Sequence, residues 1–108
     1  MAKYAVFFRF TGAAVKGLVD KPSDRAAVVS ALCESGGGRM EAYYIMFGDW
    51  DGFVIAELPD SNAAAAFSLA VSASGAFAQL STHELLDATQ LTDALSKAAS
   101  LQYTPPGN

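Results

Sequence analysis

Residues 39–58, RMEAYYIMFGDWDGFVIAEL, restrict the fold of this chain more than any other stretch. Two runs rich in aromatic and β-branched residues, 40–47 and 53–58, flank the short segment Gly48-Asp49-Trp50-Asp51-Gly52. Such runs favour strands. Glycine and aspartate favour a tight turn, because glycine accepts unusual backbone angles and aspartate hydrogen-bonds nearby N–H groups. The stretch therefore predicts a β-hairpin.

Strands and helices alternate around this hairpin. Aromatic and β-branched residues predict two further strands, at 3–10 and 76–86. Capping residues, glycines and a proline mark where helices begin and end. The first predicted helix is capped by Thr11 and broken at Lys21-Pro22, and the second is capped by Ser23 and ends at Gly36-Gly37-Gly38. The third is rich in alanine and lies between the turn at 59–62 and Gly75. The fourth starts at Asp87 or Thr89 and carries Leu91, Leu95 and Leu101 on one stripe.

This order of elements predicts the topology. A strand, a helix, a hairpin, a helix and a strand make two strand-helix-strand units that share the hairpin. Right-handed crossovers then give an antiparallel four-stranded sheet in the spatial order 4-1-3-2 with its helices on one face. We expect an α+β, ferredoxin-like βαββαβ fold with an extra C-terminal helix. We also expect residues 1–108 to form a single domain, with 102–108 as an extended tail.

Both faces of the predicted sheet carry apolar residues, although helices cover only one. In the first strand, Tyr4, Val6 and Phe8 face one side, while Ala5 and Phe7 face the other. A large apolar surface left in water marks an interaction site, and a second copy of the chain is the simplest cover. The sequence therefore predicts a homodimer in which two sheets pack face to face as a dimeric α+β barrel. It leaves further association of dimers open.

Composition excludes several classes of protein. The net charge is −4 with only seven lysines and arginines, so no basic surface for nucleic acid is expected. No apolar run approaches the roughly 18 residues that span a bilayer. The single cysteine, Cys33, cannot form an internal disulfide, and residues 1–12 lack a signal-peptide pattern. We therefore expect a cytoplasmic protein that contacts neither nucleic acid nor membrane.

The face turned toward the second copy predicts a binding site. A guanidinium enclosed there needs an acceptor, because an unpaired buried charge is costly. A small, partly apolar, anionic molecule would satisfy Arg9. Alternation of side chains along the strands assigns seven residues to this predicted lumen: Arg9, Phe7, Tyr43, Phe53, Ile55, Phe77 and Gln79.

Polar residues gather at the other end of the same face, where the topology brings Lys3, Glu41, Glu57 and His83 together. We expect a charge network at this rim. Glu57 and His83 are two strands apart, about 10 Å, which is too far to share one metal ion. The alternative is that Glu41 and Glu57 form a carboxylate pair for acid-base chemistry, since like charges separate their pKa values. No metal and no cofactor are predicted.

Two further features, the turn at 48–51 and Cys33, are expected to have structural roles. In the turn of Gly48, Asp49, Trp50 and Asp51, we expect the aspartates to cap the turn and the tryptophan to cover the sheet edge or contact the partner. The alternative is a recognition loop for a cationic or flat ligand. Cys33 lies on a helix stripe and is expected to be a small core residue.

Several linked motifs resemble the GYD domain family and span nearly the whole chain. They are KYAVFFRFT at Lys3 to Thr11, FGDWD at Phe47 to Asp51, ELPD at Glu57 to Asp60, SLAVSASGA at Ser68 to Ala76, and KAASLQYTPPG at Lys97 to Gly107. Trp50 stands where many members have tyrosine, whereas Gly48 and Asp51 match. The resemblance implies a dimeric α+β barrel and no assigned biochemical activity.

Three functions are compatible with these features. The first is a small-ligand-binding or sensory oligomeric domain that uses the lumen at Arg9. The second is a structural homo-oligomer whose lumen is closed by side chains. The third is an enzyme similar to the cofactor-independent or haem-degrading monooxygenases of the same barrel fold, an analogy that rests on fold alone. The sequence contains no catalytic signature, and we favour the first.

Overall fold

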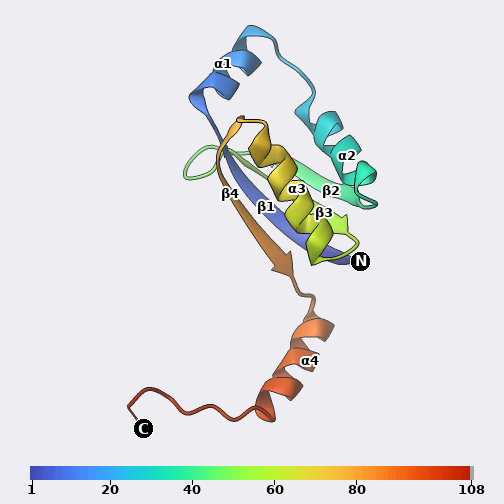
Figure 1. Ribbon diagram of the computed structural model, residues 1–108, viewed down its shortest axis with the longest axis vertical. Coiled ribbons are helices and arrows are strands. Elements are labelled where there is room, and N and C mark those ends of the chain that lie inside the picture. The colour runs from blue at the N-terminus through green and yellow to red at the C-terminus, as the bar shows by residue number, and fades with distance from the viewer. Residues whose placement is uncertain (108) are drawn as a thin grey trace.

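A computed structural model describes residues 1–107 of the chain (Figure 1). Every predicted helix and strand is present, and only their ends differ. The cap of the second helix is Asp24, whose carboxylate accepts a hydrogen bond from the Ala27 N–H at 3.1 Å, and not Ser23 as predicted. The elements are β1 (Ala2–Phe10), α1 (Gly12–Asp20), α2 (Arg25–Ser35), β2 (Arg39–Ile45), β3 (Gly52–Leu58), α3 (Ser61–Ala73), β4 (Phe77–Leu85) and α4 (Ala88–Ala99).

The four strands form one antiparallel sheet in the order β2-β3-β1-β4, which is the predicted order 4-1-3-2 in reverse. Helices α2 and α3 lie side by side on one face, α2 over β2 and β3, and α3 over β3 and β4. Figure 1 shows this layer of helices against the sheet. The chain has the predicted α+β, ferredoxin-like fold.

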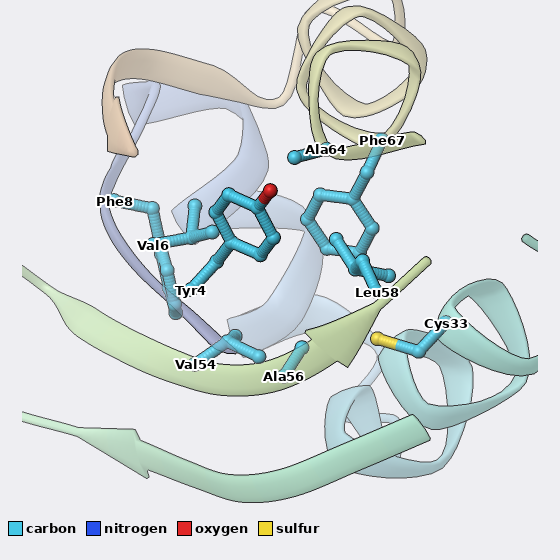
Figure 2. Packing of buried hydrophobic residues seen from close by; sticks show 9 residues of the cluster. All are labelled: Tyr4, Val6, Phe8, Cys33, Val54, Ala56, Leu58, Ala64 and Phe67. Carbon is cyan, nitrogen blue, oxygen red and sulfur yellow. The ribbon is translucent and has the colours of Figure 1, made fainter. Parts of the chain in front are cut away.

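The hydrophobic core lies between the sheet and these two helices (Figure 2). Alternate residues of the central strands point into it, as expected for strands covered on one face. Cys33 of α2 is fully buried there, and burial raises the pKa of its thiol, so the sulfur packs as a small apolar group. The core residues are Tyr4, Val6, Phe8, Cys33, Val54, Ala56, Leu58, Ala64 and Phe67.

Two β-bulges change which residues face the helices. In β2, Met40 pairs with Ala56 but Ala42 pairs with Ile55, so Glu41 is an extra residue. In β4, Gln79 pairs with Arg9 but Phe77 pairs with Phe10, so the extra residue is 78. A bulge places two residues opposite one and reverses the alternation beyond it.

The predicted positions of Tyr43 and Phe77 are therefore wrong. Both were expected in the lumen, and both lie on the face that the helices cover. The Tyr43 ring is stacked 5.9 Å from the Phe8 ring. The Phe77 ring is stacked 5.5 Å from the Phe10 ring. A strict alternation of side chains predicts the wrong face here, because each bulge shifts the pairing register by one residue on one side of the bulge.

Helices α1 and α4 bury no residue. Helix α4 starts directly after β4, where the Asp87 carboxylate accepts from the Gln90 N–H at 2.7 Å and the Gln90 side chain accepts from the Asp87 N–H at 2.9 Å. It extends away from the sheet beyond the end of β4 (Figure 1). Its stripe of Leu91, Leu95 and the following Leu101 is exposed.

Candidate functional site

The face of the sheet opposite the core carries a continuous group of aromatic rings. The Phe7 ring of β1 lies 5.6 Å from the Phe53 ring of β3 and 5.9 Å from the Trp50 ring of the turn. The Tyr44 ring of β2 lies 5.5 Å from the Phe53 ring. We call these four residues, with His83, the open-face aromatic cluster. Its members shelter one another only partly, since Phe7 and Phe53 are half-buried and Tyr44 is 60% exposed.

Five of the seven predicted lumen residues lie on this open face. Phe7, Phe53 and Ile55 occupy its centre, where Phe7 pairs with Phe53 and Ile55 pairs with Ala5. Arg9 and Gln79 are a cross-strand pair near the end of β1. Tyr44 takes the place that was predicted for Tyr43. Trp50 of the turn adds a ring against Phe7.

Arg9 is exposed next to the open-face aromatic cluster. Within residues 1–107 its guanidinium forms no salt bridge and no side-chain hydrogen bond. Its five N–H donors are therefore free to bind a group that approaches the sheet. A planar guanidinium matches carboxylate and phosphate oxygens in a two-point geometry.

His83 lies on the open face and packs its ring edge-on against the Phe7 ring at 5.9 Å. Its Nε2 atom is 2.7 Å from the Ser81 hydroxyl on the same side of β4. This hydrogen bond and the aromatic contact hold the imidazole at the sheet surface. His83 does not join the rim charge network among the described residues, although the sequence placed it there.

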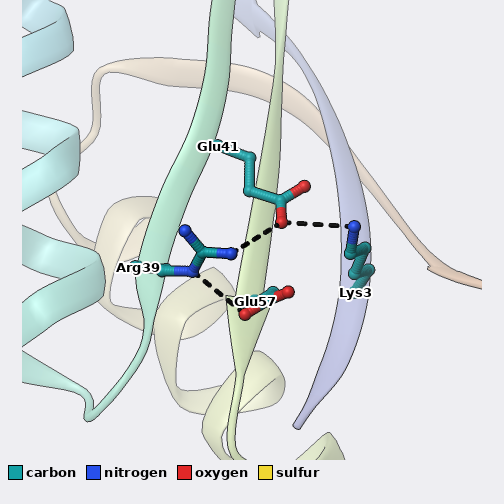
Figure 3. A network of polar contacts seen from close by, with 4 residues as sticks. All are labelled: Lys3, Arg39, Glu41 and Glu57. Atoms are coloured by element: carbon teal, nitrogen blue, oxygen red, sulfur yellow. Dashed lines mark hydrogen bonds and ion pairs between the residues drawn. The ribbon is translucent and has the colours of Figure 1, made fainter.

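The rim charge network consists of Lys3, Arg39, Glu41 and Glu57 (Figure 3). The Arg39 Nε donates to Glu57 at 3.1 Å, and its Nη2 donates to Glu41 at 3.3 Å. The Lys3 Nζ lies 3.2 Å from the same Glu41 oxygen. Two cations thus neutralise the two carboxylates, and the hydrogen bond from Arg39 holds the pKa of Glu57 below its ordinary value.

Arg39, the residue at the centre of this network, was not among the predicted site residues. The signal was present, because Arg39 is two positions before Glu41 and residues two apart share a face of a strand. The predicted strand began at Met40, which left Arg39 outside it. Within the described part of the chain, no three histidine, cysteine or acidic residues gather closely enough to hold a metal ion.

The turn residue Asp51 fastens the hairpin to the end of β1. Its N–H donates to the Phe8 carbonyl at 2.8 Å, and its carboxylate accepts from the Phe10 N–H at 2.8 Å. Its own carbonyl accepts from the Met46 N–H at 2.9 Å. Gly48 supplies a φ of 134°, which an ordinary residue rarely adopts. The turn is thus built as a structural support that lays Trp50 on Phe7.

The family model of the GYD domain matches residues 4–95, which include most of the sheet, the turn, and three members of the rim charge network, Arg39, Glu41 and Glu57. The chain belongs to the GYD domain family. No curated protein and no solved structure matches it. None of the helices between residues 1 and 107 has the length and apolar content needed to cross a membrane.

The open face of this GYD domain is suited to binding. It offers an aromatic surface for an apolar body and, beside it, a free guanidinium for an anion. The two glutamates at the rim are engaged by Arg39 and Lys3, so neither is an unpaired carboxylate poised for acid-base chemistry.

Proposed function

We propose that two copies of this GYD domain pair through their open sheet faces and enclose a site for a small, anionic, partly apolar molecule, with Arg9 as its counter-ion. The observation that supports this proposal most directly is that the open-face aromatic cluster has no cover from its own helices, while Arg9 beside it has no partner within residues 1–107.

The apolar part of the open face favours pairing. Removing apolar surface from water contributes about 25 cal/mol per Å². Phe7, Phe53, Ile55 and Tyr44 form one contiguous patch, because β1, β3 and β2 are neighbours in the sheet. The rim charge network is internally neutralised, so it can meet a second copy without presenting a bare charge. A second copy of the same face is an apolar surface of matching extent.

Pairing changes the surroundings of Arg9. A guanidinium loses hydration when a second sheet covers it, and this loss is unfavourable unless an acceptor replaces water. Its cross-strand neighbour Gln79 is an amide and cannot neutralise it. An anion bound between the copies supplies the missing charge, and its apolar part contacts the rings beside Arg9.

The pairing is tested by molar mass in solution. We expect the wild-type protein to have the mass of a dimer at micromolar concentration in light scattering. Ile55→Glu places an unpaired charge in the interface and should shift the mass to that of a monomer. The control is Val28→Glu, which changes an exposed valine on α2, away from this face. A wild-type protein of monomer mass would refute the pairing.

The ligand site is tested by thermal unfolding in the presence of small carboxylates and phosphates. A ligand that binds only the folded state raises its melting temperature with concentration. Arg9→Gln should abolish this rise while the dimer mass is retained, because the substitution removes the charge and leaves the aromatic surface.

A structural homo-oligomer without ligand is the second candidate. The packing of Trp50 on Phe7 and of Tyr44 on Phe53 favours it, since these rings fill part of the space between two sheets. If the wild-type protein is a dimer and no anion raises its melting temperature, this candidate replaces the first.

A further inference from the structure

A hollow lies between α1 and α2, on the side of the sheet opposite the open face. It consists of two adjoining clefts of about 370 and 390 Å³, each within the size of small-molecule sites. The clefts share Phe10, Leu18, Ser23 and Arg25. Phe10 is on the helix-covered side of β1, so this hollow is separate from the open face and from Arg9.

The floor of the hollow is apolar. Phe10 is half-buried, and its ring contacts the Phe8 ring at 5.2 Å and the Phe77 ring at 5.5 Å. Leu18 of α1 forms the opposite wall. Because α1 buries no residue of its own, this wall is not fixed by packing. A flat or aliphatic group has an apolar surface to lie on here.

The charged groups of the hollow are mostly cationic. The first cleft contains Lys21 and Arg25 and is lined by no acidic residue, in a chain whose net charge is −4. Asp24 lines the second cleft, but its carboxylate caps α2 by accepting from the Ala27 N–H. Asp20, the nearby acid at the end of α1, pairs with Lys16.

Arg25 is the cation best placed to bind a ligand. Its side chain is half-buried and lines both clefts. Among residues 1–107 it forms neither a salt bridge nor a side-chain hydrogen bond. A partly desolvated guanidinium interacts more strongly with an anion than one in free solvent. The Ser23 hydroxyl adds a donor beside it.

We infer that the hollow between α1 and α2 binds a small organic carboxylate with an apolar body. Arg25 takes the carboxylate through two parallel N–H bonds, Lys21 adds a second positive charge, and the apolar body lies on Phe10 and Leu18. The apolar lining favours a carboxylate with a hydrocarbon part over a bare inorganic anion.

The test is a titration of the full chain followed by amide NMR, with phenylacetate as probe. We expect saturable shifts in the amides of Phe10, Leu18 and residues 21–26. Phenylacetamide has the same ring without the charge and should bind about tenfold more weakly. Inorganic phosphate should bind more weakly than phenylacetate, because it cannot use the apolar floor.

Substitutions inside and outside the hollow test whether phenylacetate binds there. Arg25→Gln should weaken phenylacetate binding about tenfold, and Lys21→Gln by a smaller factor. Lys97→Gln removes the same charge from α4, which lies at the other end of the molecule from α1 (Figure 1), and should leave binding unchanged. Arg9→Gln should also leave it unchanged, which separates this site from the open face. An Arg25→Gln spectrum that matches the wild type elsewhere excludes misfolding.

Four outcomes would overturn the inference. The first three are shifts that do not saturate, phosphate binding as tight as phenylacetate binding, and shifts that move to Phe7 and Phe53 on the open face. The fourth is a response to phenylacetate that Arg25→Gln leaves intact.

Discussion

At the scale of single residues, Asp51 shows how the turn supports the sheet. Its carboxylate accepts from the Phe10 N–H at 2.8 Å in a partly buried position. Asp51→Ala leaves that N–H without its acceptor, so we expect a loss of about 1–3 kcal/mol in the free energy of unfolding. Asp49→Ala is the matched control, because the Asp49 side chain forms no hydrogen bond within residues 1–107. Urea denaturation measures both, and equal losses would contradict this role for Asp51.

Glu57 gives a second prediction at this scale, concerning pH. The hydrogen bond from Arg39 lowers the pKa of Glu57 from its ordinary 4.5. The charged form is therefore favoured by folding. Its contribution to stability is fully present above pH 4.5 and is lost as the pH falls through the lower pKa of the folded state. Arg39→Gln should return the pKa of Glu57 toward 4.5 in a carboxyl NMR titration.

Lys97→Gln is the control for that titration, because Lys97 pairs with Asp93 on α4, away from the rim. It should leave the pKa of Glu57 unchanged. An unchanged pKa in Arg39→Gln as well would mean that the rim charge network does not persist in solution.

At the scale of elements, the connection from α2 to β2 depends on a close approach of two backbones. A Cβ atom on Gly38 would lie 2.1 Å from the Glu57 carbonyl oxygen and 2.8 Å from a methyl group of Leu58. Gly38→Ala must therefore shift β2 away from β3, and we expect it to destabilise the fold by about 1–3 kcal/mol or more.

Gly17 is the control for Gly38, since a Cβ atom there meets no atom within 4 Å. Gly17 lies inside α1, where alanine is a better helix former by about 0.5–1 kcal/mol. Gly17→Ala should therefore be neutral or stabilising in thermal unfolding. Similar losses for both variants would show that the contact at Gly38 is not tight.

The elements themselves could be predicted from the sequence because their boundary signals are local. Thr11 caps α1 by accepting from the Ala14 N–H, and the Lys21-Pro22 step ends that helix as expected. The element order then restricted the topology to one arrangement, because right-handed crossovers leave few alternatives. Bulges are different, since they depend on how two strands pair and leave no reliable mark on either strand alone.

The positions of the candidate site residues could be predicted from the sequence only where the alternation of a strand is regular. Phe7 and Arg9 lie in β1, whose alternation is regular up to Arg9, and the structure places both on the open face. Tyr43 follows the bulge at Glu41, and its neighbour Tyr44 occupies the expected position. The Trp50 contact with Phe7 depends on the three-dimensional path of the turn, which composition alone does not specify.

At the scale of the whole molecule, the chain is elongated, with extents of 58 × 35 × 22 Å. Its radius of gyration is 17.3 Å, against about 13 Å for a compact domain of this length. Helix α4 accounts for the difference, because it projects beyond β4 (Figure 1). Only Leu86 and Asp87 separate it from the strand, and two residues span at most about 7 Å. The helix therefore begins close to the end of β4, and none of its residues is buried against the domain.

Removing α4 should consequently leave the domain intact. A chain that ends after Asp87 loses no buried residue of α4, so we expect its amide NMR spectrum for β1 to β4 to match that of the full chain. Its melting temperature should change by only a few degrees, the shift that about 0.5 kcal/mol produces in a domain of this size. A chain that ends after Leu101 removes only the tail and is the control. If the longer deletion lowers the melting temperature by about 10 °C or more while the control does not, Leu91 and Leu95 are covered in solution.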